Sequence, residues 1–138
     1  MQTFLPYRDF KKTAKSLDRQ RLGKQRVEAW QILQAITNKD YGWQNHPAVK
    51  MWRGYPIALS EYGIDICTEW INRGYKDTML ARFADFLMQQ DAPVEYPDWL
   101  GNDVFHSMHR GTLLYKNYEW YSQFSWKEIP RYEYFWPV

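Results

Sequence analysis

The sequence contains a single cysteine and no long hydrophobic run. Because Cys67 has no partner cysteine, no disulfide can form within the chain, and we expect a reducing, cytoplasmic environment. The chain starts on polar and basic residues, so we expect no secretory signal peptide. Its hydrophobic runs are only a few residues long, whereas a membrane-spanning helix needs roughly 20 apolar residues. We therefore expect a soluble protein without a membrane span.

Positive charge is concentrated at one end of the chain. The formal net charge is only +2, but residues 1–26 hold eight Lys or Arg against two Asp, a local charge of +6. Such a cluster suits a polyanion such as DNA, because each neutralised phosphate releases condensed counterions. A solvated helix surface explains the same charge equally well, so charge alone does not decide between the two.

Aromatic residues are unusually abundant, since 19% of the chain is Phe, Trp or Tyr. That much ring surface excludes a disordered chain, so many rings must be buried or must bind something flat. Because 138 residues is the usual length of one domain, we predict a single domain over residues 1–138. Core packing is expected for most tryptophans, but those near predicted loops and helix ends could stack on bases or support base flipping: Trp43, Trp52, Trp99, Trp120 and Trp136.

Apolar residues recur at helical spacing and nowhere alternate convincingly with polar ones. The sequence therefore predicts an all-α fold, a compact helical bundle with an irregular aromatic C-terminal tail. Asp9 is expected to cap a first short helix, and Pro47 and Pro56 are expected to open helical segments, because proline is tolerated in a first turn. The longer predicted helices span residues 18–36, 56–73, 77–90 and 103–114, with a loop at 38–45 and the tail at 118–138.

The predicted helix over residues 56–73 is apolar on two sides. One stripe contains Leu59 and Ile66, and a second contains Ile57, Ile64 and Ile71. A helix with two apolar sides is normally enclosed by its neighbours. We therefore predict that this is the central buried helix.

The predicted helix over residues 18–36 carries a cluster of polar side chains. At about 100° per residue, Arg21, Lys24, Gln25 and Glu28 occupy neighbouring positions on the helix surface, roughly a third of a turn from the apolar stripe. Glu28 thus lies at the edge of the core, where a carboxylate can take part in catalysis. An ordinary surface ion pair between Lys24 and Glu28, contributing about 0.3 to 0.5 kcal/mol, is the competing interpretation.

Three segments resemble a known family in their order and spacing. The first is LDRQRLGKQRVEAW (residues 17–30), the second combines NHPAVKMWRGY with YGIDICTEWINRGY, and the third is FHSMHRGTLLYKNYEWY followed by YFWP. Together they resemble the pyrimidine-dimer DNA glycosylase family, and most closely a bacterial and phage branch of it. Glu28 falls on the catalytic glutamate of the family, with Gln20 and Leu22 at the spacing found there.

The resemblance implies a DNA glycosylase that also cleaves the strand. In this family an N-terminal amine attacks the sugar C1′ of a damaged pyrimidine nucleotide, an imine forms, and β-elimination breaks the backbone. A carboxylate supports this step because positive charge builds on the deoxyribose as the base departs. An α-amine, with a pKa of about 8, is a better nucleophile at neutral pH than a lysine at about 10.4. The resemblance further implies no metal and no cofactor.

The start of the chain departs from the phage members of the family. Those members expose a threonine once the initiator methionine is removed, whereas Gln2 is too bulky for that removal. Either the Met1 amine attacks, or Glu28 activates a water molecule. Arg21 replaces a histidine, and Val27 stands where the phage enzyme has an arginine. The lesion specificity is therefore not carried over, and the predicted substrate is a damaged or modified pyrimidine.

We predict that Glu28, Met1 and Arg21 are catalytic. The partner is expected to be double-stranded DNA, bound by a monomer, with the segment YEYFWP (residues 132–137) as the best candidate for a DNA-facing element in the tail. The residues predicted to bind DNA are Gln2, Thr3, Arg8, Lys24, Gln25, His46, His106, His109, Arg110, Lys116 and Trp136.

Alternatives to this prediction exist at two levels. His106 and His109 have the spacing of metal ligands, with His46 or Glu28 as a third ligand, although the family resemblance argues against a metal. Structural hydrogen bonding is as good an explanation for the histidines as phosphate contact. At the level of function, a DNA-binding protein without catalytic activity would use the same basic segment, and a small metal-dependent hydrolase is a third reading.

Overall fold

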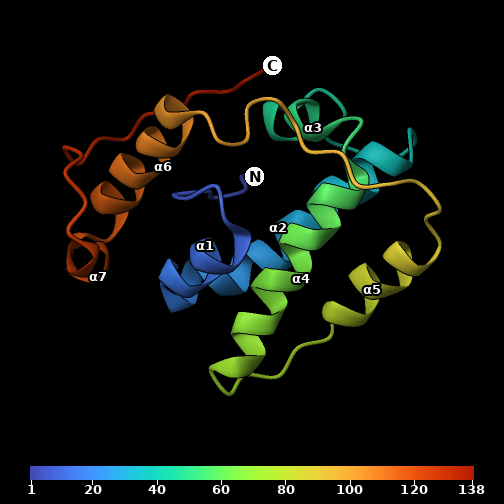
Figure 1. Ribbon diagram of the computed structural model, residues 1–138, viewed down its shortest axis with the longest axis horizontal. Coiled ribbons are helices and arrows are strands. Elements are labelled where there is room, and N and C mark those ends of the chain that lie inside the picture. The colour runs from blue at the N-terminus through green and yellow to red at the C-terminus, as the bar shows by residue number, and fades with distance from the viewer.

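The computed structural model describes residues 1–138, and it consists of helices without any β-strand. The all-α prediction is therefore confirmed. In Figure 1 the helices α2 and α4 form the centre, with α5 on one side and α6 and α7 on the other. The elements are α1 (Phe10–Ser16), α2 (Arg19–Thr37), α3 (Pro47–Trp52), α4 (Pro56–Asn72), α5 (Leu80–Met88), α6 (Asp103–Lys116), α7 (Tyr118–Tyr121) and a 3-10 turn (Ser122–Phe124).

The helices begin and end where local chemistry favours it. The Asp9 side chain accepts the backbone N–H of Lys12 at 2.7 Å, so the predicted cap of α1 is confirmed. Pro47 and Pro56 stand in the first turns of α3 and α4, as expected. Gly74 follows the end of α4 at a φ of +95°, a conformation that glycine adopts without strain.

Two predicted boundaries are wrong. Helix α5 starts at Leu80 instead of residue 77, because the Asp77 carboxylate accepts the backbone N–H groups of Met79 and Leu80 and so caps the helix from outside it. The tail is not irregular from residue 118 onward. Asn117 caps Trp120 at 3.2 Å, so α7 and the 3-10 turn form first, and irregular backbone starts only at Ser125.

Helix α4 is the central helix, packed against α1, α2 and α5. Gly63 makes this possible, since a Cβ at that position would lie 2.4 Å from the Phe83 ring of α5. Leu59 and Ile66 are fully buried, as predicted. Ile71, at the end of the second stripe, is 43% exposed. The two-sided burial thus holds for the middle of the helix only.

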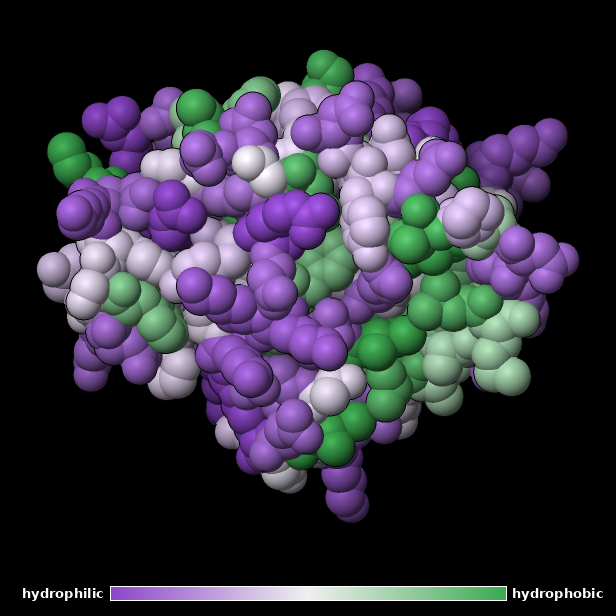
Figure 2. Space-filling view, in the orientation of Figure 1, coloured by the Kyte–Doolittle hydropathy of each residue, from purple (hydrophilic) through white to green (hydrophobic).

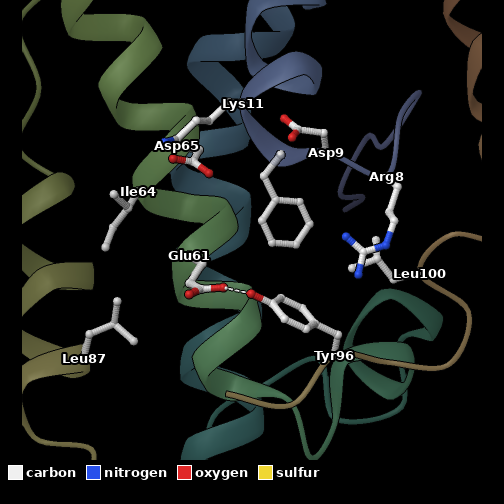
Figure 3. A pocket seen from close by; sticks show the side chains of 10 residues that line it. Arg8, Asp9, Lys11, Glu61, Ile64, Asp65, Leu87, Tyr96 and Leu100 are labelled. Carbon is white, nitrogen blue, oxygen red and sulfur yellow. Dashed lines mark hydrogen bonds between the residues drawn. The ribbon is translucent and has the colours of Figure 1, made fainter. Parts of the chain in front are cut away.

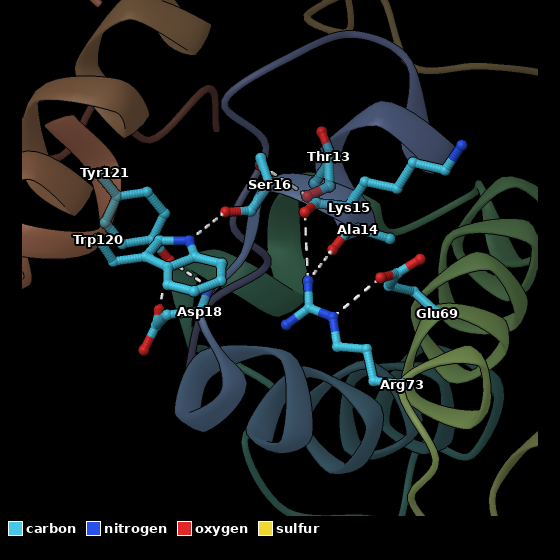
Figure 4. A network of polar contacts seen from close by, with 9 residues as sticks. All are labelled: Thr13, Ala14, Lys15, Ser16, Asp18, Glu69, Arg73, Trp120 and Tyr121. Atoms are coloured by element: carbon cyan, nitrogen blue, oxygen red, sulfur yellow. Dashed lines mark hydrogen bonds and ion pairs between the residues drawn. The ribbon is translucent and has the colours of Figure 1, made fainter. Parts of the chain in front are cut away.

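A polar network fastens α7 to the first helices (Figure 4). The Tyr121 hydroxyl donates to the Asp18 carboxylate and accepts the Asp18 backbone N–H. The Trp120 indole donates to the Ser16 carbonyl at 2.8 Å. On the other side of α1, Arg73 pairs with Glu69 and also donates to the carbonyls at the end of α1. Buried polar groups keep their hydrogen bonds here, so the contact is specific in its geometry.

The surface is mixed in character. Figure 2 shows hydrophobic residues gathered over the α4 and α5 region and hydrophilic residues over most of the rest of that face. None of the helices has both the length and the hydropathy needed to span a membrane.

Candidate active site

The first residues of the chain run through the interior without regular secondary structure. Residues 2–6 are buried, and backbone groups in such a segment need partners that no helix or sheet supplies. The Leu5 N–H donates to Nδ1 of His109 at 2.8 Å, and the Leu5 carbonyl lies 2.7 Å from Nδ1 of His106. The Pro6 carbonyl accepts from Arg110 at 2.8 Å. Side chains of α6 therefore hold the N-terminal segment in place.

Gln25 of α2 is the polar centre of this arrangement. Its side-chain amide is only 1% exposed, and it joins the N-terminal segment from the opposite side. The Gln25 oxygen accepts the Phe4 N–H at 3.0 Å and the Tyr62 hydroxyl at 2.6 Å. Its amide nitrogen donates to the Gln2 carbonyl at 2.9 Å and to Glu28 at 3.0 Å. A fully bonded buried amide of this kind fixes both the N-terminal segment and Glu28.

Glu28 lies beside the first residues of the chain. Its Oε2 atom accepts from Gln25 and, at 3.3 Å, from the backbone N–H of Gln2. The side chain is half-buried, and no ion pair forms between it and Lys24. The surface pair that competed with a catalytic role is therefore not formed. The carboxylate is instead held by hydrogen bonds that leave its second oxygen free.

A cavity of about 230 Å³ opens over Glu28. It brings together the polar cluster predicted on α2 with the chain start, α6 and the tail. Three cations surround the one carboxylate, so the cavity favours an anionic ligand that also presents an electron-poor carbon to Glu28. The lining residues are Met1, Gln2, Phe4, Gln20, Arg21, Lys24, Gln25, Glu28, Lys116, Tyr132 and Tyr134.

Arg21 is oriented by the network that fastens α7. Its guanidinium pairs with the Asp18 carboxylate at 3.2 Å, and only 18% of its side chain is exposed. Asp18 also accepts the Tyr121 hydroxyl, so burial and this hydrogen bond raise the pKa of Tyr121. Arg21 is thus a fixed cation at the cavity wall, while the exposed Lys24 is free to move.

Lys116 reaches the cavity from the last turn of α6. Its ammonium lies 4.8 Å from the centre of the Tyr132 ring and forms no ion pair with a carboxylate. Burial lowers the pKa of Lys116, and the nearby charges of Arg21 and Lys24 lower it further, against the opposing effect of Glu28. Lys116 is therefore a partly buried amine at the cavity wall whose pKa is lower than that of an ordinary surface lysine.

His46 stands next to this region at the start of α3. Its Nδ1 accepts the Ala48 N–H at 3.0 Å, so its neutral form carries a proton on Nε2. The ring makes edge contacts with Trp43 and Trp136, each at 5.9 Å between ring centres. Burial and the positive charge of the Met1 amine lower the pKa of His46, whereas Glu28 raises it. His46 and Trp136 are therefore neighbours of the cavity without lining it.

Arg8 is not brought to this cavity. It is exposed and lies over the Tyr96 ring at 5.6 Å, in a separate cavity of about 520 Å³ between α1, α4 and the loop before α6 (Figure 3). Glu61 and Asp65 of α4 line that cavity as well, and Glu61 accepts the Tyr96 hydroxyl at 2.7 Å. Arg8 therefore does not belong to the residues around Glu28.

Four further residues predicted to bind DNA have structural positions instead. His106 and His109 are buried and hold Leu5, and Thr3 is buried and accepts the Trp52 indole N–H at 2.9 Å. Arg110 pairs with Glu128 at 2.9 Å in addition to its bond to Pro6. These contacts give the four residues a structural role, and their contact with DNA stays a prediction. No group of three or more His, Cys, Asp or Glu side chains is arranged to hold a metal ion.

The tail contributes two residues that were not singled out individually. Tyr132 and Tyr134 line the cavity, inside the segment predicted to face DNA. The tail backbone is fastened to α6, since Thr112 donates to the Glu133 carbonyl at 2.6 Å and the Arg131 N–H donates to the Gly111 carbonyl at 3.1 Å. Burial raises the pKa of Tyr134 to about 12, so its hydroxyl stays a hydrogen-bond donor. In the sequence, the spacing of Tyr132 and Tyr134 two positions apart was the feature that could have predicted that both line the cavity.

One comparison with known proteins gives a match. A family model described as pyrimidine dimer DNA glycosylase matches residues 1–83, which is more than half of the chain and includes Glu28 and the whole of α1 to α4. Neither the curated proteins nor the solved structures contain a significant match.

Proposed function

Because the chain belongs to the pyrimidine dimer DNA glycosylase family and is thus a DNA glycosylase, we propose that it removes a damaged or modified pyrimidine from double-stranded DNA with Glu28 as its central carboxylate. The observation that carries this proposal is the position of Glu28. It lies at a cation-lined cavity, beside the first residues of the chain, where the resemblance requires the reacting sugar to bind.

Glu28 would act through the charge of its carboxylate. When the base leaves, positive charge develops at C1′ and on the ring oxygen of the deoxyribose. A carboxylate already fixed by Gln25 and the Gln2 N–H needs no reorganisation to stabilise that charge, which is the condition under which electrostatic catalysis is strongest. Arg21 and Lys24 would hold the phosphates on either side of the extruded nucleotide.

The attacking group is the Met1 amine or a water molecule activated by Glu28. Met1 lines the cavity and supports the amine route, in which the enzyme also breaks the strand by β-elimination. In the water route the base is released and the strand stays intact. A nicked strand together with a borohydride-trapped adduct identifies the amine route, and base release without either identifies the water route.

The decisive experiment compares base release with DNA binding. Duplexes that each carry one photoproduct, oxidised or alkylated pyrimidine are incubated with the wild type and with Glu28→Gln, which keeps the size and hydrogen-bonding capacity of the side chain. We expect base release from at least one lesion and a loss of about 100-fold or more in the variant, while the Kd for the duplex stays within about twofold. Glu119→Gln, at an exposed site on α7, is the matched control.

Two outcomes contradict the proposal. Tight binding without base release from any lesion in the panel indicates a DNA-binding protein that lacks catalytic activity. Full activity of Glu28→Gln shows that the reaction does not depend on this carboxylate.

A further inference from the structure

Three primary amines line the cavity over Glu28. Lys24 is exposed on α2, and the other two come from segments that lie far apart in the sequence. One is the α-amine of Met1, and the other is the side chain of Lys116 at the last turn of α6. Both line the same space of about 230 Å³ as Glu28, so a single sugar bound there lies near both. From the sequence, Lys116 was predicted only to bind DNA. An ordinary lysine is almost fully protonated at neutral pH and so is a poor nucleophile.

The surroundings of Lys116 differ from those of an ordinary surface lysine. A cation at the end of a helix is normally stabilised by the helix dipole. Here partial burial together with Arg21 and Lys24 outweighs that effect, and the pKa of the amine is lowered. Glu28 is the only acidic residue that lines the cavity, and it forms no ion pair with Lys116. Desolvation and neighbouring cations are the standard means of making a lysine nucleophilic.

The Tyr132 ring adds a geometric restraint. The Lys116 ammonium lies 4.8 Å from the ring centre. Tyr132 belongs to the tail, and the residues on either side of it, Arg131 and Glu133, are both hydrogen-bonded to α6. A cation near an aromatic face is attracted to it without being neutralised. The amine is thus held at the cavity wall by a contact that leaves its nitrogen available for reaction.

We propose that Lys116 is a second catalytic amine, which forms an imine with C1′ of an abasic nucleotide; this inference rests on the proposed glycosylase function. On an abasic site the Nζ lone pair adds to the C1′ aldehyde, the nitrogen loses a proton, and water leaves as the C=N bond forms. Loss of a proton from C2′ then expels the 3′ phosphate with the electrons of the C3′–O bond. Hydrolysis of the imine returns the free amine.

The test maps the attachment site on the unmodified protein. Wild-type protein is incubated with a duplex that carries one abasic site, the imine is reduced to a stable amine by borohydride, and the trapped protein is digested and sequenced by mass spectrometry. We expect the DNA-derived mass on the peptide that contains Lys116. An adduct confined to the Met1 peptide, or no adduct at all, overturns the proposal.

A pair of variants separates nucleophilic attack from phosphate binding. Lys116→Arg keeps the positive charge but has no nucleophilic amine, so we expect the adduct on this peptide to disappear while duplex binding changes less than about twofold. Lys50→Arg, in the last turn of α3, is the matched control and should give the wild-type map. An unchanged total adduct yield in Lys116→Arg, all of it on Met1, also overturns the proposal.

The same samples distinguish failure of the Lys116 proposal from failure of the proposed glycosylase function. Base release from lesion-containing duplexes is measured in parallel with the mapping. Base release with no adduct on Lys116 overturns the second amine and leaves the glycosylase in place. An adduct on Lys116 without base release from any lesion supports the amine chemistry and counts against the proposed substrate class.

Discussion

The contacts within the first half of the molecule differ in kind from those that attach the second half to it. In the first half, which the family match covers as far as residue 83, α1, α2 and α5 pack around α4 through apolar side chains. In the second half, α6 packs closely with no helix except α7. The second half is linked to the first by the polar network of α7, by buried side chains of α6 in the common core, and by the buried N-terminal segment, which shares hydrogen bonds with His106, His109 and Arg110. The cavity lies where the two halves meet.

This difference assigns separate tasks to the two halves. The first supplies Glu28, Arg21 and Lys24 on a rigid helix. The second supplies Lys116 and the two tyrosines of the tail, and it fixes the position of the first residues of the chain. Apolar packing therefore sets the stability of the scaffold, whereas polar contacts between the halves set the geometry of the site. Four variants and conditions test this division.

The largest effect is expected from breaking the apolar half. Gly63→Leu places side-chain atoms where the Phe83 ring now lies, since even a Cβ would approach it to 2.4 Å. We expect a loss of about 4 kcal/mol in the free energy of unfolding, measured by urea denaturation. Gly42→Leu is the control, because nothing lies within 4 Å of that Cβ position. Equal stability of the two variants would contradict the packing described for α4 and α5.

The next effect comes from the polar centre that joins the halves. Gln25→Met keeps the length of the side chain but leaves the Phe4 N–H and the Gln2 carbonyl without partners. Two unpaired buried groups should lower the free energy of unfolding by about 3 kcal/mol. Base release should fall as well, because Glu28 loses one of its two donors. Gln31→Met on the same helix should change neither quantity, and activity retained in Gln25→Met would show that Glu28 needs no such support.

Acid should weaken the contact between the halves. Burial lowers the pKa of His109 to about 3, and its Nδ1 is already occupied by the Leu5 N–H. Below the ordinary pKa of about 6.5 the unfolded chain binds a proton that the folded chain does not. The free energy of unfolding should therefore fall by about 1.4 kcal/mol for each pH unit between about 6.5 and 3 from this residue.

Urea denaturation of the wild type and of His109→Gln at several pH values checks this. The glutamine can accept the Leu5 N–H through its carbonyl and does not titrate, so its stability should depend less steeply on pH. Parallel curves for the two proteins would show that His109 does not carry the acid sensitivity.

The smallest effect is expected in the tail. Thr112→Val keeps the shape of the side chain but removes the hydroxyl that donates to the Glu133 carbonyl at 2.6 Å. The same hydroxyl accepts the Glu133 N–H at the longer distance of 3.3 Å. The loss of both contacts should cost about 1 kcal/mol locally and should raise the rate of trypsin cleavage after Arg131 about fivefold. Thr37→Val, whose hydroxyl bonds within its own helix, should leave that rate unchanged. An unchanged rate in Thr112→Val would mean that other contacts hold the tail.

Local patterns in the sequence were enough for the helices and for the polar face of α2. Helical spacing and capping residues act over three or four positions, so Asp9 and Pro56 could be interpreted without knowledge of the rest of the chain. The α2 boundaries agree with prediction to within one residue. Asp77 was misread because a carboxylate can begin a helix or cap it from outside, and its pairing with Arg26 is not visible in local spacing.

The partners of the N-terminal segment could not be predicted in this way. His106 and His109 bond to a residue about a hundred positions earlier, and no local period encodes such a pairing. Polar residue type suggested DNA contact for His109, but not that this side chain is buried and bonded to Leu5. The burial of Gln25 could have been predicted, because it lies next to Leu22 and Ala29 at the edge of the apolar stripe.

The buried N-terminal segment has a consequence for biosynthesis. Leu5 is made well before its two partners in α6, which lie 101 and 104 positions later. While the nascent chain leaves the ribosome, α1 to α5 can pack as they appear, but the histidine partners of Leu5 are supplied only by α6. The surroundings of the first residues, and with them the cavity wall, are therefore completed only after α6 has been made.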